Sequence, residues 1–213
     1  MKAMRNFILA AFCLLALTPS LFAANLIINS GFEDPITYDG PPFVGSWEGF
    51  NGGAGSSAAN STLFPLSGLQ SLQLSIVNTP NTFAGAFQDI AGLVPGTEYT
   101  FGGWNATTSN PLSLGVEVRI EWRNSVSNTE IARTPNLTPI PGSSYSPFSL
   151  VAAVPAGADT ARLVYAVQSF STSPLGNGTV YVDDVSFALV PEPSTMALLS
   201  LAGLAFAFRR VRA

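Results

Sequence analysis

The sequence predicts an all-β fold, a jelly-roll β-sandwich flanked by an N-terminal signal helix and a short C-terminal transmembrane helix. Three observations support this prediction. Apolar and polar residues alternate with a period of two in several stretches, which is typical of strands that bury one face. Turn residues separate these stretches, and between positions 24 and 189 no run of ten residues shows helical spacing. The intervening length of about 165 residues suits one domain with a sizeable core.

The first 23 residues have the three parts of a secretory signal peptide. Lys2 and Arg5 supply the positive start, residues 7–17 are apolar, and a polar break that ends in small residues follows. This order directs export, and cleavage is expected after Ala23 or Ala24. The sandwich domain is therefore expected to cover residues 24–189.

The strands of this domain are predicted from the alternation. The clearest covers residues 114–123, where Leu114 and Trp122 lie on an apolar face and Glu117, Arg119 and Glu121 lie on a solvated one. The other predicted strands cover residues 25–28, 72–76, 83–90, 98–105, 147–154, 160–168 and 179–189. Small polar residues at 49–62 and prolines within 134–147 predict two long loops.

The charge of the predicted domain argues against nucleic-acid binding. Its basic residues are Arg119, Arg123, Arg133 and Arg162, set against twelve carboxylates, for a net charge of about −8. Such a surface repels phosphate backbones.

The residue inventory argues against catalysis. The chain has no histidine, and its one cysteine, Cys13, lies in the signal peptide, so no Ser–His or Cys–His pair can form. The two carboxyl groups of a glycosidase lie about 5–9.5 Å apart, whereas Glu117 and Glu121, four residues apart on one strand, are separated by roughly 13 Å. A cross-strand pair with Glu130 leaves glycoside hydrolysis as a third hypothesis for the function.

Three features follow one another in the last segment, residues 190–213. They are carried by Val190, Pro191, Glu192 and Pro193, then by an apolar run at 196–208, and then by Arg209, Arg210 and Arg212. As a helix, the run spans about 20 Å, which is short against a hydrocarbon core of about 30 Å, although the arginines can extend it to the interface. The alternative is an amphipathic helix packed on the domain, but the run has no polar stripe.

This tail resembles the PEP-CTERM sorting signal of Gram-negative bacteria. The resemblance implies export, a transient anchor in the inner membrane, and processing near Pro-Glu-Pro by an exosortase, a membrane cysteine transpeptidase. Positive flanks at both ends agree with this, because they keep the ends cytoplasmic and the middle outside. The resemblance also implies a final place at the cell surface or in an exopolysaccharide or biofilm matrix.

The domain itself resembles carbohydrate-binding modules of the galactose-binding-like jelly-roll type. The motifs that carry this resemblance are NLIINSGFE at 25–33, Trp47, SGLQSLQL at 67–74, LVPGTEYTFGGW at 93–104, VPAGADTARLVY at 154–165 and VYVDDVSF at 180–187. It implies a non-catalytic protein that tethers exopolysaccharide. The alternative is a purely structural or adhesive matrix protein without a small glycan ligand.

Three acidic residues are candidates for a structural calcium site. In the resembling modules, the glutamate of the GFE motif and an aspartate of the DDV motif meet beside Ca²⁺, which here implies Glu33 with Asp183 and Asp184. Carboxylate oxygens are the ligands that Ca²⁺ prefers, and adjacent aspartates repel each other unless they are compensated. The alternative is that one aspartate is exposed and the other accepts backbone hydrogen bonds.

Aromatic rings beside amide groups are candidates for a sugar-binding platform. Trp47 begins a loop, Trp104 ends a predicted strand, and Tyr38 and Asn105 lie near them in the sequence. The alternative for each aromatic residue is packing in the core, which is the simpler interpretation of Trp122.

Replacing Pro191, Glu192 and Pro193 together by alanine should leave full-length protein in the membrane fraction, because the exosortase then lacks its recognition sequence. Cell fractionation and immunoblotting measure this outcome. Alanines at Ser194 and Thr195 are the matched control and should be processed like the wild type. Identical fractionation and migration of the triple variant and the wild type would show that the tail is no sorting signal.

Overall fold

The computed structural model describes residues 23–170 and 175–191, and every helix or strand assigned within them is a β-strand. Asn25–Leu189 form one compact unit. The predicted signal peptide up to residue 22 and the tail from residue 192 onward lie outside the described residues. The strands are β1 (Glu48–Asn51), β2 (Ser56–Ser61), β3 (Ser71–Thr79), β4 (Thr82–Ala91), β5 (Glu98–Thr107), β6 (Gly115–Asn124), β7 (Thr129–Arg133), β8 (Ser146–Ala153), β9 (Thr160–Ser169) and β10 (Gly176–Leu189).

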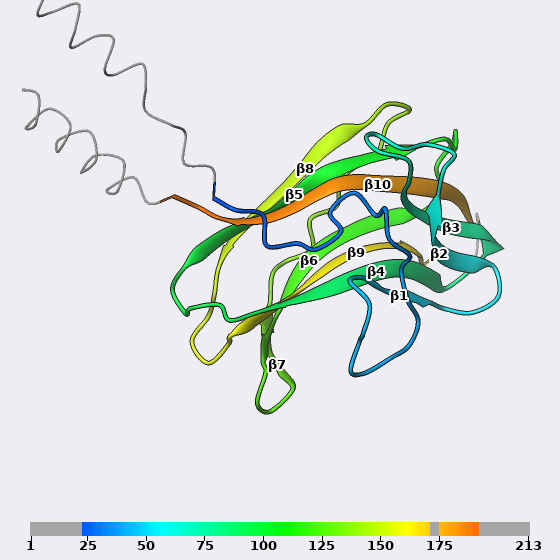
Figure 1. The fold of residues 1–213 in the computed structure, drawn as a ribbon. Coiled ribbons are helices and arrows are strands. Elements are labelled where there is room, and N and C mark those ends of the chain that lie inside the picture. The colour runs from blue at the N-terminus through cyan, green and yellow to red at the C-terminus, as the bar shows by residue number, and fades with distance from the viewer. Residues whose placement is uncertain (1–22, 171–174, 192–213) are drawn as a thin grey trace, which may run out of the picture. The chain divides into compact units, whose positions relative to one another are not determined.

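These strands form two five-stranded antiparallel sheets that lie one above the other (Figure 1). Sheet A has the order β1-β4-β9-β6-β7, and sheet B has the order β2-β3-β10-β5-β8. Strands that follow one another in the sequence often lie in different sheets, as β8, β9 and β10 do. The arrangement confirms the predicted all-β sandwich.

The core lies between the sheets and takes alternate residues from each strand. In β6, Val116, Val118, Ile120 and Trp122 point into it, as the period of two predicts. Burial of each such side chain stabilises the fold by about 1.5–3 kcal/mol. Apolar packing is therefore the main source of stability in a domain that contains no cysteine.

Most predicted strands are present, as β3, β4, β5, β6, β8, β9 and β10. The prediction of a loop at residues 49–62 is wrong, because this range contains the end of β1 and all of β2. β2 lies at the edge of sheet B and pairs with β3 alone, so backbone hydrogen bonds form it without large side chains. β7, a short edge strand of sheet A, was not predicted either.

The predicted strand at residues 25–28 is also wrong. Asn25 Oδ1 accepts hydrogen bonds from the backbone N–H groups of Ile27 and Phe187, and Gln88 bonds both the N–H and the C=O of Ile28. Side chains thus satisfy backbone groups that a neighbouring strand would otherwise satisfy. The first segment of the domain is held against β10 and β4 without joining a sheet.

Candidate functional site

The outer face of sheet A carries two adjoining strips of side chains. Residues directly opposite each other on antiparallel strands share a face, so the strand register defines which side chains meet. The aromatic strip consists of Phe43, Phe50, Phe83 and Phe87, on β1, β4 and the preceding loop. The polar strip consists of Asp89, Glu117, Arg119, Glu121, Glu130, Arg133, Arg162 and Gln168, on β4, β6, β7 and β9.

The rings of the aromatic strip lie close enough to interact. The ring centroids of Phe50 are 6.0 Å from Phe83 and 6.3 Å from Phe87, and Phe43 meets Phe87 edge-on at 5.1 Å. Phe83 is 45% exposed. A Cβ atom at Gly85 would lie 2.4 Å from the Phe50 ring, so the glycine lets this ring lie flat on the sheet. The strip is therefore a continuous, partly exposed apolar surface.

The polar strip is a network of charge-assisted hydrogen bonds. Arg119 bonds both Glu117 and Glu121, the latter at 2.8 Å from its Nε, and Gln168 Nε2 donates to Glu117 at 2.7 Å. Glu117 and Glu121 are only 8% and 7% exposed. The prediction that they lie on a solvated face is thus wrong, because their partners on β6 and β9 cover them.

Arg162 joins the two strips. Its Nε and Nη2 each donate to Asp89 at 2.8 Å, and its Cζ lies 3.9 Å from the Phe87 ring centroid. Burial alone would lower the pKa of Arg162, yet its hydrogen bonds and charge attraction to Asp89 raise that pKa above its ordinary value. The guanidinium is therefore fixed as a cation with its plane beside an aromatic ring.

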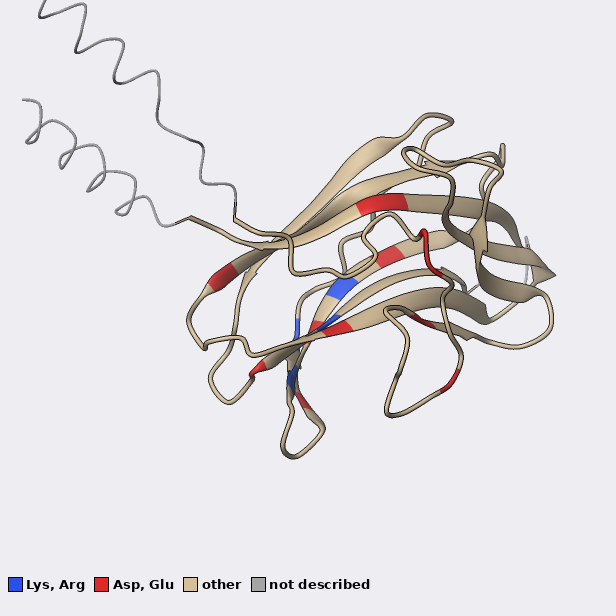
Figure 2. Ribbon diagram, viewed as in Figure 1, with Lys and Arg blue, Asp and Glu red and all other residues tan. Residues whose placement is uncertain are grey.

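All four arginines of the described residues lie on this sheet, on β6, β7 and β9 (Figure 2). Arg119, Arg133 and Arg162 are ion-paired with carboxylates of the strip, and Arg123 bonds the backbone and side chain of Asn128. With Glu48, which is opposite Phe87, five carboxylates stand against the four arginines, so this face is close to neutral on a strongly acidic domain.

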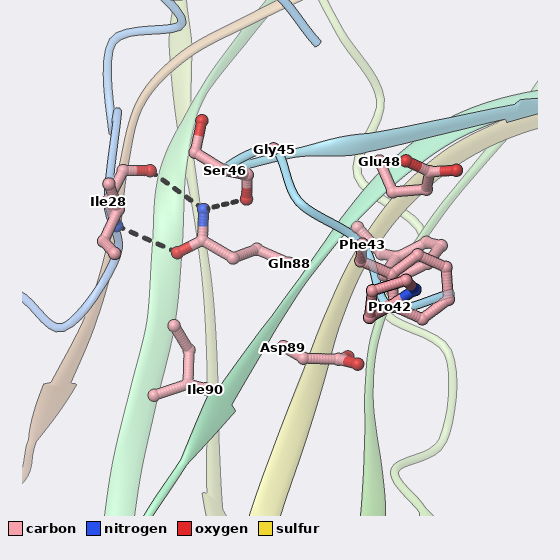
Figure 3. A pocket seen from close by; sticks show the side chains of 10 residues that line it. Ile28, Pro42, Phe43, Gly45, Ser46, Glu48, Gln88, Asp89 and Ile90 are labelled. Atoms are coloured by element: carbon pink, nitrogen blue, oxygen red, sulfur yellow. Dashed lines mark hydrogen bonds between the residues drawn. The ribbon is translucent and has the colours of Figure 1, made fainter. Parts of the chain in front are cut away.

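A pocket of about 280 Å³ opens at the edge of sheet A where β1 begins. The last pair between β1 and β4 is Glu48–Phe87, and beyond it the edge of β4 has no strand beside it. Figure 3 shows Gln88 bonded there to Ile28 and Ser46, with Phe43 and Asp89 on the other side. The pocket is lined by Ile28, Pro42, Phe43, Gly45, Ser46, Glu48, Phe87, Gln88, Asp89 and Ile90.

Two of the four residues predicted to form a sugar platform are buried. Trp47 is 1% exposed, packs on Phe32 with centroids 4.9 Å apart, and donates from Nε1 to Asn29 O at 3.1 Å. Asn105 has no exposed surface and donates to the Tyr165 hydroxyl at 2.9 Å. Neither residue can belong to a surface platform. Trp47 is packed in the core, as its alternative stated. Asn105 points inward because it alternates along β5 with the outward-facing Trp104.

The other two predicted residues are exposed but belong to different surfaces. Trp104 is 39% exposed on the outer face of sheet B, opposite Pro147 of β8. Tyr38 is exposed beside β1 and donates its hydroxyl to Ala58 O at 2.7 Å. The structure therefore does not assemble the predicted four-residue platform.

The aromatic strip was missed, although the sequence contained a signal for it. In residues 83–87, phenylalanines at both ends alternate with Ala84 and Ala86 around a central Gly85. The large apolar residues therefore lie on the face opposite the core-facing alanines. This reversal of the usual pattern was the sequence signal for an exposed apolar surface.

The three acidic residues predicted as calcium ligands converge on one loop, residues 64–70. Asp183 Oδ2 accepts from the N–H groups of Leu66 and Ser67, and its Oδ1 accepts from Asp184 N. Asp184 Oδ1 accepts from Ser67 Oγ at 2.7 Å. Glu33 Oε1 accepts from the N–H groups of Leu69 and Gln70. A side chain larger than that of glycine at position 68 would place its Cβ atom against this oxygen.

The donors around these carboxylates decide how well they fit Ca²⁺. Among the described residues, no three Asp, Glu, His or Cys side chains have the arrangement of a metal site. Asp183 is fully buried, and burial raises its pKa while its three backbone hydrogen bonds oppose the rise. Glu33 Oε2 and Asp184 Oδ2 accept no hydrogen bond from any described residue. These two oxygens are the ligands that remain available, and calcium stays a prediction.

Comparisons with known proteins identify the tail and the fold. Residues 189–212 match the PEP-CTERM protein-sorting motif, which implies export and membrane-anchored processing in Gram-negative bacteria. No curated protein is recognisably similar to the whole sequence. In the described residues no helix is long and apolar enough to cross a membrane, and the predicted span at 196–208 lies outside them.

Solved structures resemble the sandwich at low sequence identity. The enzymatically active domain of tailspike protein 4 from bacteriophage CBA120 gives a TM-score of 0.60 at 20% identity, over 78% of this chain but 21% of its own, so the chain spans about a fifth of that protein. The CBM22-1 xylan-binding domain of Paenibacillus barcinonensis Xyn10C gives 0.52 at 12% identity, over 82% and 99%.

TmCBM61, solved in complex with β-1,4-galactotriose, gives a TM-score of 0.51 at 10% identity, over 79% and 100% of the two chains. These similarities show the fold. The chain carries a PEP-CTERM sorting motif that follows, in the sequence, a jelly-roll sandwich of the kind found in carbohydrate-binding modules.

Trp47→Ala should destabilise the domain by about 3–5 kcal/mol, because it empties a packed core position, whereas Trp104→Ala should cost about 1 kcal/mol or less. For a domain of this size, each kcal/mol of lost stability lowers the melting temperature by roughly 2–4 °C. Circular dichroism melts of the two variants measure it. Equal melting temperatures would contradict the burial of Trp47.

If Ca²⁺ binds between Glu33 and Asp184, EGTA should lower the melting temperature by several degrees. Calcium at a hundred times its Kd stabilises the native state by about 2.7 kcal/mol. Each kcal/mol raises the melting temperature by roughly 2–4 °C. Glu33→Gln should abolish the effect of EGTA while keeping an Oε1 acceptor for the loop. A wild-type melt that EGTA leaves unchanged would establish the hydrogen-bonded alternative.

Proposed function

We propose that the exported sandwich binds a neutral glycan on the outer face of sheet A and tethers exopolysaccharide at the cell surface or in the matrix. One observation carries the proposal: an exposed aromatic strip runs directly beside a fixed polar strip. Sugars have both kinds of surface, because their C–H groups form apolar patches and their hydroxyls form the rim. A face that pairs rings with polar groups fits both.

The rigidity of the polar strip supports this function. Arg119 is held between Glu117 and Glu121, and Arg162 is held by Asp89. A carboxylate oxygen that accepts one hydrogen bond can still accept a second, so Asp89, whose side chain is 32% exposed, can receive a sugar hydroxyl without rearranging. Because the side chains are already ordered, binding loses little of their conformational entropy.

The charge balance of the face favours a neutral glycan over an acidic one. Arg119, Arg133 and Arg162 are already paired with carboxylates of the protein, so a uronic acid would have to compete with those carboxylates. The net charge of the domain is strongly negative and would also repel a polyanion. Neutral sugars meet neither obstacle.

The same geometry favours binding over catalysis. Glu117 and Glu121 share Arg119 between them, and both are held in the ion-paired layer. The oxygens that a catalytic acid or base would present to a glycosidic bond are thus engaged with Arg119 and Gln168, and both glutamates are largely buried. A non-catalytic role therefore fits the glutamates better than glycoside hydrolysis does.

A structural or adhesive role has one supporting observation of its own. Leu63, Leu66 and Leu69 are exposed on the loop that the carboxylates of Glu33 and Asp183 hold in place. Exposed apolar side chains on a fixed loop suit contact with a protein neighbour.

A glycan array of the detergent-solubilised full chain should show binding to neutral glycans. Phe83→Ala and Phe87→Ala should each weaken that binding about tenfold, which corresponds to about 1.4 kcal/mol of lost stacking energy. Trp104→Ala is the matched control on sheet B and should leave affinity unchanged. Isothermal titration calorimetry gives the affinities.

The proposal fails if the wild type binds no neutral glycan. It also fails if Trp104→Ala abolishes binding while both phenylalanine variants bind normally, since that result would move the site to sheet B.

A further inference from the structure

The pocket at the start of β1 is continuous with one line of the polar strip. Asp89 is opposite Arg162, Arg162 is opposite Glu121, and Glu121 is opposite Arg133 in the register of sheet A. This line crosses β7, β6, β9 and β4 in turn. It ends at Asp89, which lines the pocket. A glycan that follows the line from β7 arrives at the pocket after crossing four strands.

The loop of residues 39–46 forms the far wall of this pocket and is held in place. Phe43 N donates to Gly40 O at 2.7 Å, and Val44 N donates to Asp39 Oδ2 at 3.2 Å. The buried carboxylate of Glu48 accepts from Gly40 N at 2.9 Å and from Thr37 Oγ1 at 3.0 Å. The wall is therefore part of the folded structure.

The ring of Phe43 places the loop of residues 39–46 across the end of the line of side chains that runs from Arg133 to Asp89. Its ring meets Phe87 edge-on and lies 5.2 Å from the Arg162 guanidinium carbon. The aromatic strip and the Asp89–Arg162 pair thus both stop against the same loop. A chain on this face has no straight continuation past Phe43.

The size and lining of the pocket suit one sugar ring. Its volume of about 280 Å³ is just under the roughly 300 Å³ at which pockets for drug-sized ligands begin. Ile28, Phe43, Phe87 and Ile90 give it apolar walls, and Asp89 offers carboxylate oxygens to hydroxyl groups. One neutral ring with several hydroxyls has the matching chemistry.

We propose that the pocket holds the terminal sugar of a neutral glycan, so that the sandwich recognises the end of a chain and not its interior. The proposal rests on the proposed function of sheet A and specifies which part of the glycan this face binds. Each polysaccharide chain then offers one site of this kind, whatever its length.

The binding stoichiometry tests the proposal. β-1,4-linked xylan, galactan and glucan oligomers, sorted by length, are titrated into the detergent-solubilised full chain in a calorimeter. The expected result is one protein bound per glycan chain at every length, with weaker binding when one chain end is chemically blocked. Protein bound in proportion to chain length, with no effect of blocking either end, would overturn end recognition while leaving glycan binding intact. No binding of the wild-type protein to these oligomers or to any neutral glycan of the array would overturn both proposals.

A pocket-filling variant gives an independent measurement. Ile28 lines the pocket and is largely exposed, so Ile28→Trp fills the space with little effect on folding. Affinity should fall at least tenfold. Ile140→Trp is the matched control at an exposed site outside the pocket and should bind like the wild type. Equal affinities of the two variants, each with a wild-type melting temperature, would overturn the role of the pocket.

Discussion

The register of β9 between β4 and β6 is the constraint on which the candidate site depends. It sets Arg162 opposite both Asp89 and Glu121, and it sets the small Ala166 between Gly85 and Glu117. A slip of β9 by one residue would turn Arg162 and Ala166 toward the core and expose Leu163, Tyr165 and Val167 instead. Burial of those three apolar residues therefore fixes the position of charged groups on the opposite face. Packing in the core thereby determines which charged side chains meet on the outer face of sheet A.

Much of the fold could be predicted because a period of two is a local property. The alternation in residues 114–123 identifies β6 and its buried side without knowledge of any partner strand. The same alternation does not say which strands are neighbours. Arg119 lies between Glu117 and Glu121 on one strand, but the bond from Gln168 of β9 that helps to cover Glu117 therefore could not be foreseen.

The errors at the candidate site have the same origin. Trp47 was a candidate for the sugar platform because it begins a loop, but its burial depends on Phe32 and on Asn29, which lie more than a dozen positions away in the sequence. The convergence of Glu33, Asp183 and Asp184 was predicted from a family resemblance and not from the alternation. The alternative of backbone hydrogen bonds describes Asp183, but its donors, the N–H groups of Leu66 and Ser67, are 117 and 116 positions away in the sequence and could not be named from it.

The position of β10 affects how the domain carries mechanical load. This strand is the longest in the sandwich, lies in the middle of sheet B, and leads directly toward the sorting segment. It pairs with β3 on one side and β5 on the other. Near its C-terminal end, the Asn25 side chain bonds the backbone C=O of Val185 and the backbone N–H of Phe187. A pull along β10 from the tail meets these two ladders in shear, so their hydrogen bonds must break together and not one after another. Tension between a held tail and a bound polysaccharide would therefore reach the domain through the strand that is best placed to resist it.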